Sequence, residues 1–198
     1  MQPFWDQRYT ENDWVYGEAP NAWFKAFIDS QPEPGRLLLP AEGEGRNAVY
    51  AAEKGWEVFA FDFSPVARDK ALALAARKGV QIRYERMDIA AFRATDSFDA
   101  VGLVFVHLPE PLRKIFHAEI YYALRPGGQL VMEAFTPEQL QYQSGGPKEL
   151  SLLYDPVVIC QDFPLLHRLY CQQEIIELNE GPFHQGKASV MRLLGKRP

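Results

Sequence analysis

The chain has 198 residues, of which 47% are apolar and 24% charged, so a single domain can bury a full core without disulfides or metals. Its formal net charge of −5 and the lack of a long basic run argue against DNA or RNA as a general partner. No uncharged apolar window approaches about 18 residues, and the N-terminus lacks the pattern of a signal peptide. We therefore expect one cytoplasmic domain that binds neither nucleic acid nor membrane, as a monomer or a homodimer.

Strand-like and helix-like segments alternate from residue 36 to residue 136, which predicts a parallel sheet covered by helices. In chain order the expected elements are a strand at 36–39, a helix at 47–54, a strand at 56–61, a helix from Ser64 to about Gly79, strands at 80–87 and 98–106, a helix at 109–124 and a strand at 129–135. Ser64 is the expected N-cap of the second helix, with Pro65 at its first position.

The last third of the chain has a different pattern. Residues 136–147 are loop-like, and residues 150–163 predict a short helix plus a loop. Two further strands, 166–180 and 187–196, flank a turn that is too short for a helix, so they should be antiparallel neighbours. Five parallel strands closed by this hairpin predict an α/β, Rossmann-like three-layer sandwich around a seven-stranded, mostly parallel sheet.

Ligands of open α/β sheets bind at the carboxyl ends of the strands, so the residues that follow each strand are the candidates for a site. Gly43 and Gly45, after the first strand, allow a ligand to approach the backbone, and the next helix N-terminus favours an anionic group. Asp62, after the second strand, either accepts both ribose hydroxyls of an adenosine or caps a helix. Asp88, after the third, either accepts from an adenine amino group or is a turn residue.

Three parts of the sequence carry a family resemblance. Residues 43–50 (GEGRNAVY), 55–58 (GWEV) and Asp62 resemble the nucleotide-binding segment of the tellurite-resistance methyltransferases. Residues 98–101 and 124–128 are similar to later motifs of class I methyltransferases in general. The opening is similar to the lid segment of tellurite-resistance and thiopurine-type enzymes in its residues Trp5, Asp6, Arg8, Tyr9, Tyr16, Gly17, Pro20 and Asn21.

The resemblance spans most of the chain and implies S-adenosylmethionine as the cofactor. It implies a single domain, 1–198, divided into a lid segment (1–30), a cofactor-binding core (31–136) and a substrate-side loop with the antiparallel strands (137–198). The cofactor would contact the residues of the strand ends and the loop, namely Glu42, Gly43, Gly45, Asp62, Phe63, Met87, Asp88 and Ile89.

The chain departs from the family in the loop after its first strand. Where the family has the pattern D-L-G-C-G-x-G, Leu39 replaces the acid and Ala41 the first glycine. In the family this region holds the methionine end of the cofactor. Glu42 either substitutes as the carboxylate that faces the ammonium group or is a solvated loop residue.

Acceptor-side residues are expected around the transferred methyl group. His107, after the fourth strand, is the candidate catalytic residue, as a base or a positioning group, and its alternative role is a strand-end residue that bonds to the backbone. His184, in the hairpin loop, either contacts the acceptor or is a surface turn residue. The other candidates are Trp5, Arg8, Tyr9 and Tyr16 in the lid, and Glu133 and Phe135 at the end of the fifth strand. For Trp5 and Tyr9 the alternative is simple packing of the N-terminal segment on the sheet.

The two cysteines, Cys160 and Cys171, belong to no C-x-x-C pair, so we expect two reduced, partly buried thiols. The four histidines show no metal-ligand spacing, and no metal is expected.

These features predict a methyltransferase that acts on a small molecule, including a soft nucleophile such as tellurite or a thiol. The alternative is a non-catalytic S-adenosylmethionine-binding or regulatory module. An NAD-dependent oxidoreductase is disfavoured because the third glycine of G-x-G-x-x-G is absent. A protein or nucleic-acid methyltransferase is disfavoured because no N-P-P-Y-like tetrapeptide follows the fourth strand.

Overall fold

The computed structural model of the chain describes residues 2–11 and 13–198, which form one seven-stranded sheet in the order β3-β2-β1-β4-β5-β7-β6. The strands are β1 (Arg36–Pro40), β2 (Glu57–Asp62), β3 (Arg83–Arg86), β4 (Phe98–Val104), β5 (Leu124–Phe135), β6 (His167–Asn179) and β7 (Gln185–Lys196). Those from β1 to β5 pair in parallel, whereas β7 pairs antiparallel with both β5 and β6. The predicted fold class is confirmed.

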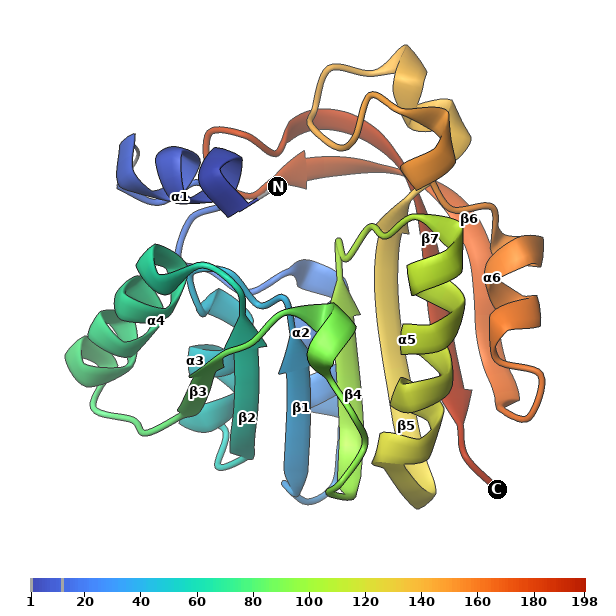
Figure 1. Cartoon of the computed structure of the whole chain (residues 1–198), viewed down its shortest axis with the longest axis horizontal. Coiled ribbons are helices and arrows are strands. Elements are labelled where there is room, and N and C mark those ends of the chain that lie inside the picture. The colour runs from blue at the N-terminus through green and yellow to red at the C-terminus, as the bar shows by residue number, and fades with distance from the viewer. Residues whose placement is uncertain (1, 12) are drawn as a thin grey trace.

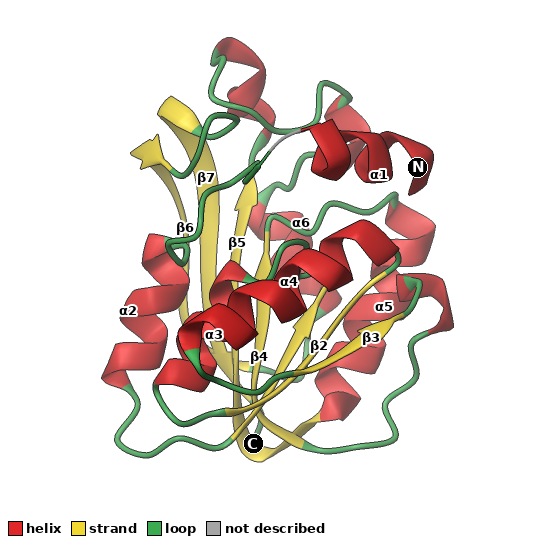
Figure 2. Cartoon of the chain, turned by 90° about the vertical axis from the view of Figure 1, so that its left-hand side faces the viewer, coloured by secondary structure: helices red, strands yellow, loops and turns green. Residues whose placement is uncertain are grey.

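Helices cover both faces of the sheet. They are α1 (Gln2–Glu11), α2 (Ala22–Ser30), α3 (Arg46–Glu53), α4 (Pro65–Lys78), α5 (Glu110–Ala123) and α6 (Pro156–Asp162), with three short 3-10 helices, η1 (Ile89–Ala91), η2 (Pro137–Gln141) and η3 (Leu150–Leu152). Figure 1 shows α5 and α6 in front of the sheet, and the turned view of Figure 2 shows α2 and α3 on the opposite face. No helix of the described residues is long and apolar enough to cross a membrane.

The alternation of side chains along β1 builds the two halves of the core. Leu37 and Leu39 pack with Phe24 of α2 and Ala48 of α3, whereas Leu38 packs on the α5 side. All three leucines are fully buried, which explains why the strand is a continuous apolar run instead of an alternating one.

Two strands are shorter than their apolar sequence predicts. β3 begins at Arg83 because Gly79, at φ 71°, and Val80 are used to end α4: both amides donate to the Ala75 carbonyl. β4 ends at Val104 because Phe105 adopts φ 54°, a left-handed conformation that stops an extended chain.

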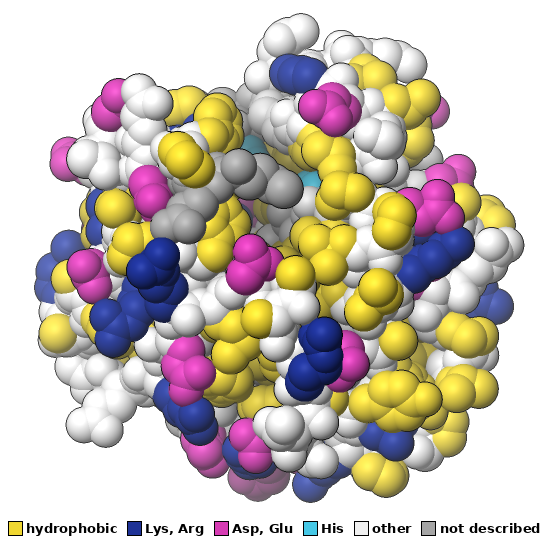
Figure 3. All heavy atoms as spheres, in the orientation of Figure 1, with side chains coloured by type: hydrophobic (Ala, Val, Ile, Leu, Met, Phe, Trp, Pro, Cys, Tyr) yellow, Lys and Arg dark blue, Asp and Glu magenta, His cyan; other side chains and the backbone are white. Residues whose placement is uncertain are grey.

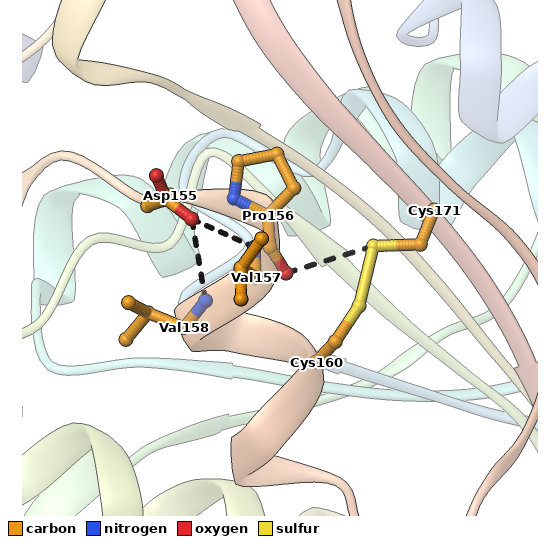
Figure 4. The surroundings of a disulfide bond; sticks show 6 residues. All are labelled: Asp155, Pro156, Val157, Val158, Cys160 and Cys171. Atoms are coloured by element: carbon orange, nitrogen blue, oxygen red, sulfur yellow. Dashed lines mark hydrogen bonds between the residues drawn. A yellow bond between two sulfur atoms is a disulfide. The ribbon is translucent and has the colours of Figure 1, made fainter.

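The two cysteines are joined in a disulfide between α6 and β6, so the prediction of reduced thiols is wrong (Figure 4). The cause is tertiary: Asp155 caps α6 through the amides of Val157 and Val158, and the helix then lies against β6. Nothing in the spacing of Cys160 and Cys171 indicates this packing.

Candidate active site

The carboxyl ends of the parallel strands meet at one edge of the sheet, beneath segments from both ends of the chain. In Figure 1 the strand arrows point up toward α1, and the tip of the β6–β7 hairpin bends over toward the same helix. Residues 137–152, with η2 and η3, form a cap beside them. Figure 3 shows a hollow between the lobe of α1 and the lobe of this cap, with histidine atoms visible inside it.

The loop after β1 has the tight backbone that a close approach requires. Gly43 and Gly45 adopt φ 65° and 86°, values that side chains disfavour. A Cβ at Gly45 would lie 2.5 Å from the Ala71 side chain, so this glycine serves the packing of α3 on α4. A Cβ at Gly43 would lie 2.9 Å from the hydroxyl of Tyr9, so Gly43 faces the edge where a ligand would bind.

Glu42 caps α3. Its Oε1 accepts from the amides of Asn47 and Ala48, both at 2.8 Å. Burial raises the pKa of its carboxyl to about 7, against the lowering by the Ala48 amide and by Arg46. The expectation of a solvated loop residue is therefore wrong. The chain's own carboxylate also lies at the helix N-terminus that we expected to favour an anionic ligand group.

Asp62 connects the ends of β1 and β2. Its Oδ2 accepts from the Gly43 amide at 3.2 Å and its Oδ1 from the Ser64 amide at 2.9 Å. Ser64, not Asp62, is the N-cap of α4, because its Oγ accepts from the Ala67 amide. Burial raises the pKa of Asp62 to about 6, although the Ser64 and Gly43 amides lower it. A carboxylate with one bond at each oxygen still has lone pairs for hydroxyl donors.

The residues after β3 lie next to the end of β2, since the Met87 amide donates to the Asp62 carbonyl at 2.9 Å. Asp88 is exposed, and its Oδ1 caps η1 through the Ala90 amide at 2.8 Å, as the turn interpretation expects. Phe63 and Met87 are half-buried and Ile89 is buried, so an apolar surface adjoins these two strand ends.

The lid lies directly on the loop after β1. Tyr9 is 5% exposed and stacks on Trp5 with ring centroids 5.6 Å apart, while its hydroxyl contacts Gly43. Burial and the nearby Asp62 carboxylate raise the pKa of Tyr9 well above its ordinary value. The structure therefore places Tyr9 beside the glycine loop and Asp62, whereas its position in the lid predicts either an acceptor contact or simple packing on the sheet.

The buried carboxylate of Glu44 connects the lid to the loop after β1. Glu44 accepts from the Val15 amide at 2.9 Å and from Lys70 Nζ at 2.7 Å, and Lys70 also donates to the Tyr9 carbonyl. Sequence reasoning missed Glu44 and Lys70. Glu44 is the variable residue between two glycines of the loop, and nothing in the pattern marks it.

Both ring nitrogens of His107 bond to the main chain. Nδ1 lies 2.7 Å from the Leu152 carbonyl oxygen, and Nε2 accepts from the Phe135 amide at 3.3 Å. Burial lowers the pKa of His107 to about 4, so the ring is neutral and Nδ1 donates. With no free nitrogen, His107 is not available as a base in this structure. Its geometry fits the alternative role of a strand-end residue.

Four rings from four parts of the chain form what we call the aromatic cluster: Tyr16, Phe105, Phe135 and His184. Ring centroids are 4.3 Å apart for Tyr16 and His184, 4.7 Å for Phe105 and His184, and 4.5 Å for Phe105 and Phe135. Phe105, at φ 54°, adopts a conformation that costs about 1–3 kcal/mol in a residue with a side chain. Sequence reasoning missed Phe105, because backbone strain leaves no mark on an apolar run.

A buried polar network adjoins the aromatic cluster at Glu180, whose Oε2 lies 3.5 Å from His184 Nδ1. Glu133, fully buried, accepts from Asn21 Nδ2 and from Arg192 Nε, both at 2.6 Å. Asn21 Nδ2 also donates to Glu180 Oε1 at 2.9 Å, and Arg46 Nη2 donates to Glu180 Oε2 at 2.8 Å. Glu133 is thus a structural junction between β5, β7 and the start of α2. Asn21 and Arg46 belong to the sequence motifs that resemble the methyltransferase family, but only the folded structure shows that they contact Glu180.

Arg8 and Trp5 both lie near Tyr16 of the aromatic cluster: Arg8 donates a hydrogen bond to Tyr16, and the ring centroids of Trp5 and Tyr16 are 6.5 Å apart. The Arg8 guanidinium lies over the rings of Phe4, Trp5 and Phe183, at 4.5, 5.3 and 4.9 Å from their centroids. Arg8 therefore connects α1 to the β6–β7 hairpin, above the aromatic cluster. No group of three or more His, Cys, Asp or Glu side chains within residues 2–11 and 13–198 is placed to hold a metal ion.

Residues 40–128 match the family model described as "Methyltransferase domain". The chain is 32% identical over 120 residues to a demethylmenaquinone methyltransferase of Thermus thermophilus, covering 58% of this chain and 54% of that protein. It is 26% identical over 142 residues to a 2-heptyl-1-hydroxyquinolin-4(1H)-one methyltransferase of Mycobacteroides abscessus, covering 70% and 62%. The chain thus spans between half and two thirds of the length of these relatives.

Two solved structures show the same fold. TehB from Haemophilus influenzae superimposes with a TM-score of 0.74 at 15% identity, over 90% of this chain and 63% of that one. The N-methyltransferase NodS from Bradyrhizobium japonicum, in complex with S-adenosyl-L-homocysteine, gives 0.68 at 17% identity, over 100% and 89%.

Proposed function

We propose that the chain is a class I, S-adenosylmethionine-dependent methyltransferase that transfers a methyl group from S-adenosylmethionine to a small-molecule acceptor. The match of residues 40–128 to a methyltransferase domain model supports this proposal. The observation that carries this proposal is the junction of Asp62 with the Gly43 amide, which puts a buried carboxylate and a tight glycine loop at one edge of the sheet. This pair suits a cofactor whose ribose binds the carboxylate and whose methionine part approaches the backbone of the glycine loop closely.

The residues fit the cofactor at the adenosine end. Asp62 would accept the ribose hydroxyls, and Asp88 would accept from the adenine amino group, with Phe63, Met87 and Ile89 as apolar contacts. At the other end, the Glu42 carboxylate at the α3 N-terminus attracts an ammonium group and repels a carboxylate. The sulfonium supplies an activated methyl group with a neutral leaving group.

The protein's own contribution is alignment and exclusion of water. The lid covers the loop after β1, and the cap and hairpin cover the ends of β4 and β5. We place the acceptor against the aromatic cluster, to which Glu133 is linked through Asn21, Glu180 and His184.

Two acceptor classes suit this wall. A soft nucleophile such as tellurite or a thiolate reacts without a base. A flat aromatic acceptor would stack on the cluster, and the names of the two curated relatives refer to a menaquinone precursor and a hydroxyquinolone. We further propose that the protein acts in the cytoplasm as a monomer or a homodimer and does not bind nucleic acid, as its net charge of −5 favours.

The experiment is methyl transfer itself. Purified protein is incubated with methyl-labelled S-adenosylmethionine and three acceptors: tellurite, a small thiol and an aromatic alcohol. We expect labelled product and S-adenosyl-L-homocysteine with at least one acceptor, and a large loss with Asp62→Ala. Binding of the cofactor without transfer to any of them, in the presence of a correctly folded protein, would favour the non-catalytic module instead.

A further inference from the structure

His184 differs from His107 in how its ring is held. Its Nδ1 lies 3.5 Å from Glu180 Oε2, and Nε2 has no hydrogen-bond partner among the described residues. The side chain is nearly fully buried, in the turn between β6 and β7. The protein therefore holds Nδ1 of His184 through Glu180, whereas Nε2 makes no hydrogen bond to the described residues.

Glu180 decides which nitrogen carries the proton. Burial raises the pKa of Glu180, but hydrogen bonds from His184 and Arg46 outweigh this and lower it to about 2. A carboxylate only accepts, so Nδ1 must be the donor and Nε2 must hold a lone pair. Burial lowers the pKa of His184, which keeps the ring neutral near pH 7.

The main chain of Gly145 in the cap loop, at φ 113°, lies against the edge of the imidazole that carries Nε2. A Cβ there would come within 2.7 Å of Cδ2 and 3.2 Å of Nε2, so the glycine keeps that edge free of a side chain from this position. The faces of the same ring contact Tyr16 and Phe105 of the aromatic cluster. Nε2 therefore lies on the wall at which we place the acceptor.

We propose that His184 is the general base of the reaction, that Glu180 is its positioning residue, and that the acceptor is a flat molecule with an ionisable hydroxyl or N–H group. This inference rests on the proposed function. The acceptor's X–H bond breaks and its proton goes to Nε2, while X forms a bond to the methyl carbon. The carbon–sulfur bond breaks, its electron pair stays on the sulfur of the departing thioether, and the imidazolium later releases its proton to water.

The charges around His184 come from four elements. Glu180 of the same turn stabilises the imidazolium, whereas Arg46 of α3 and Arg8 of α1 oppose it, and His107 after β4 contributes as a neutral ring. Tyr16, whose pKa is raised by burial, is neutral as well. Because these charges partly cancel, the imidazolium is neither strongly stabilised nor strongly destabilised, and the ring can take up a proton and release it again.

The first test needs no acceptor. Nitrogen NMR of the imidazole rings in the protein saturated with S-adenosyl-L-homocysteine reports the tautomer of each histidine, with His184→Gln to assign the signal. We expect a neutral His184 ring with the proton on Nδ1 at about pH 7, and a shift of the tautomer in Glu180→Gln. A proton on Nε2, or a charged ring, would overturn the proposal.

The second test uses two probes of one shape: 2-naphthol, which is protonated near pH 7, and 2-naphthalenethiol, which ionises far more readily. His184→Gln should lower kcat for the naphthol by about 10²-fold or more and remove the acid limb of its pH profile. Turnover of the thiol should change little. Glu180→Gln should act in the same direction, and Glu180→Asp should restore part of the activity.

The control is His167→Gln, at an exposed histidine of β6, which should change neither rate. An equal loss for both acceptors, or full naphthol turnover by His184→Gln, would overturn the base. Failure of the wild type to bind S-adenosyl-L-homocysteine would instead refute the proposed function. If neither probe reacts, the tautomer measurement decides.

Discussion

At the residue scale, the role of a polar side chain at a strand end depends on which of its atoms the main chain already uses. The position of His107 after β4 predicts either a base or positioning group for the acceptor, or a strand-end residue that bonds to the backbone. The Leu152 carbonyl and the Phe135 amide occupy both nitrogens of that ring, whereas Glu180 directs only one nitrogen of His184. The residues at the strand ends predict where the site lies, whereas the hydrogen bonds of each side chain determine which chemical role it can take.

His107→Ala should therefore reduce stability. It leaves the part-buried Leu152 carbonyl and the buried Phe135 amide without these partners, and a buried unsatisfied group costs about 1–3 kcal/mol. Urea denaturation would show the loss, while calorimetry should show nearly unchanged S-adenosyl-L-homocysteine affinity. Unchanged stability together with a lost acid limb of the pH profile would return the role of base to His107.

Glu42 gives stability a specific pH dependence. Its pKa is about 7 in the fold and 4.5 as the ordinary value, so between these pH values the folded chain holds a proton that the unfolded chain has lost. Its contribution to the unfolding free energy therefore falls as pH rises from 4.5 to 7, by about 3 kcal/mol in total. Glu42→Gln keeps an acceptor for α3 and loses the titration.

The measurement is the difference in unfolding free energy between the wild type and Glu42→Gln across that pH range. Three histidines with lowered pKa, namely His107, His117 and His184, change stability in the opposite direction, but they are the same in both proteins and cancel. A flat difference would show that Glu42 is ionised throughout.

At the element scale, Glu44 is central to the contacts that hold the lid. Glu44→Gln loses the ion pair with Lys70, and a charge-assisted hydrogen bond contributes about 1.5–3 kcal/mol. Amide hydrogens of α1 should therefore exchange about tenfold faster or more. Glu11→Gln, at an exposed position of α1 itself, is the matched control. Equal exchange in both variants would show that packing alone holds the lid.

The elements themselves follow from local patterns, with exceptions that have tertiary or backbone causes. The alternation of strands and helices predicts β1 to β5 in order, and the absence of a helix between 180 and 187 predicts the hairpin. Backbone geometry at Gly79 and Phe105 shortens β3 and β4. The disulfide between α6 and β6 depends on the docking of two elements, which no local pattern contains.

At the scale of the whole molecule, the fold predicted from the sequence is confirmed and residues 40–128 match a methyltransferase domain model, because the glycine pattern and the alternation of strands and helices are properties of the chain itself. The acceptor side was less predictable. Glu180, Arg46 and Asn21 meet only when the hairpin bends over to the start of α2 and α3, across a sequence separation of 134 residues for Arg46 and Glu180. Three distant polar residues have no common pattern in the sequence.

The most direct test of the central claim is calorimetric titration of the protein with S-adenosyl-L-homocysteine and, separately, with NAD. We expect micromolar binding of the former and no binding of NAD. Asp62→Ala should weaken the binding by about 1.5–3 kcal/mol for each lost charge-assisted bond, with a smaller effect on melting temperature. Binding of NAD without a response to S-adenosyl-L-homocysteine would contradict the account, as would full affinity in Asp62→Ala with a large fall in melting temperature.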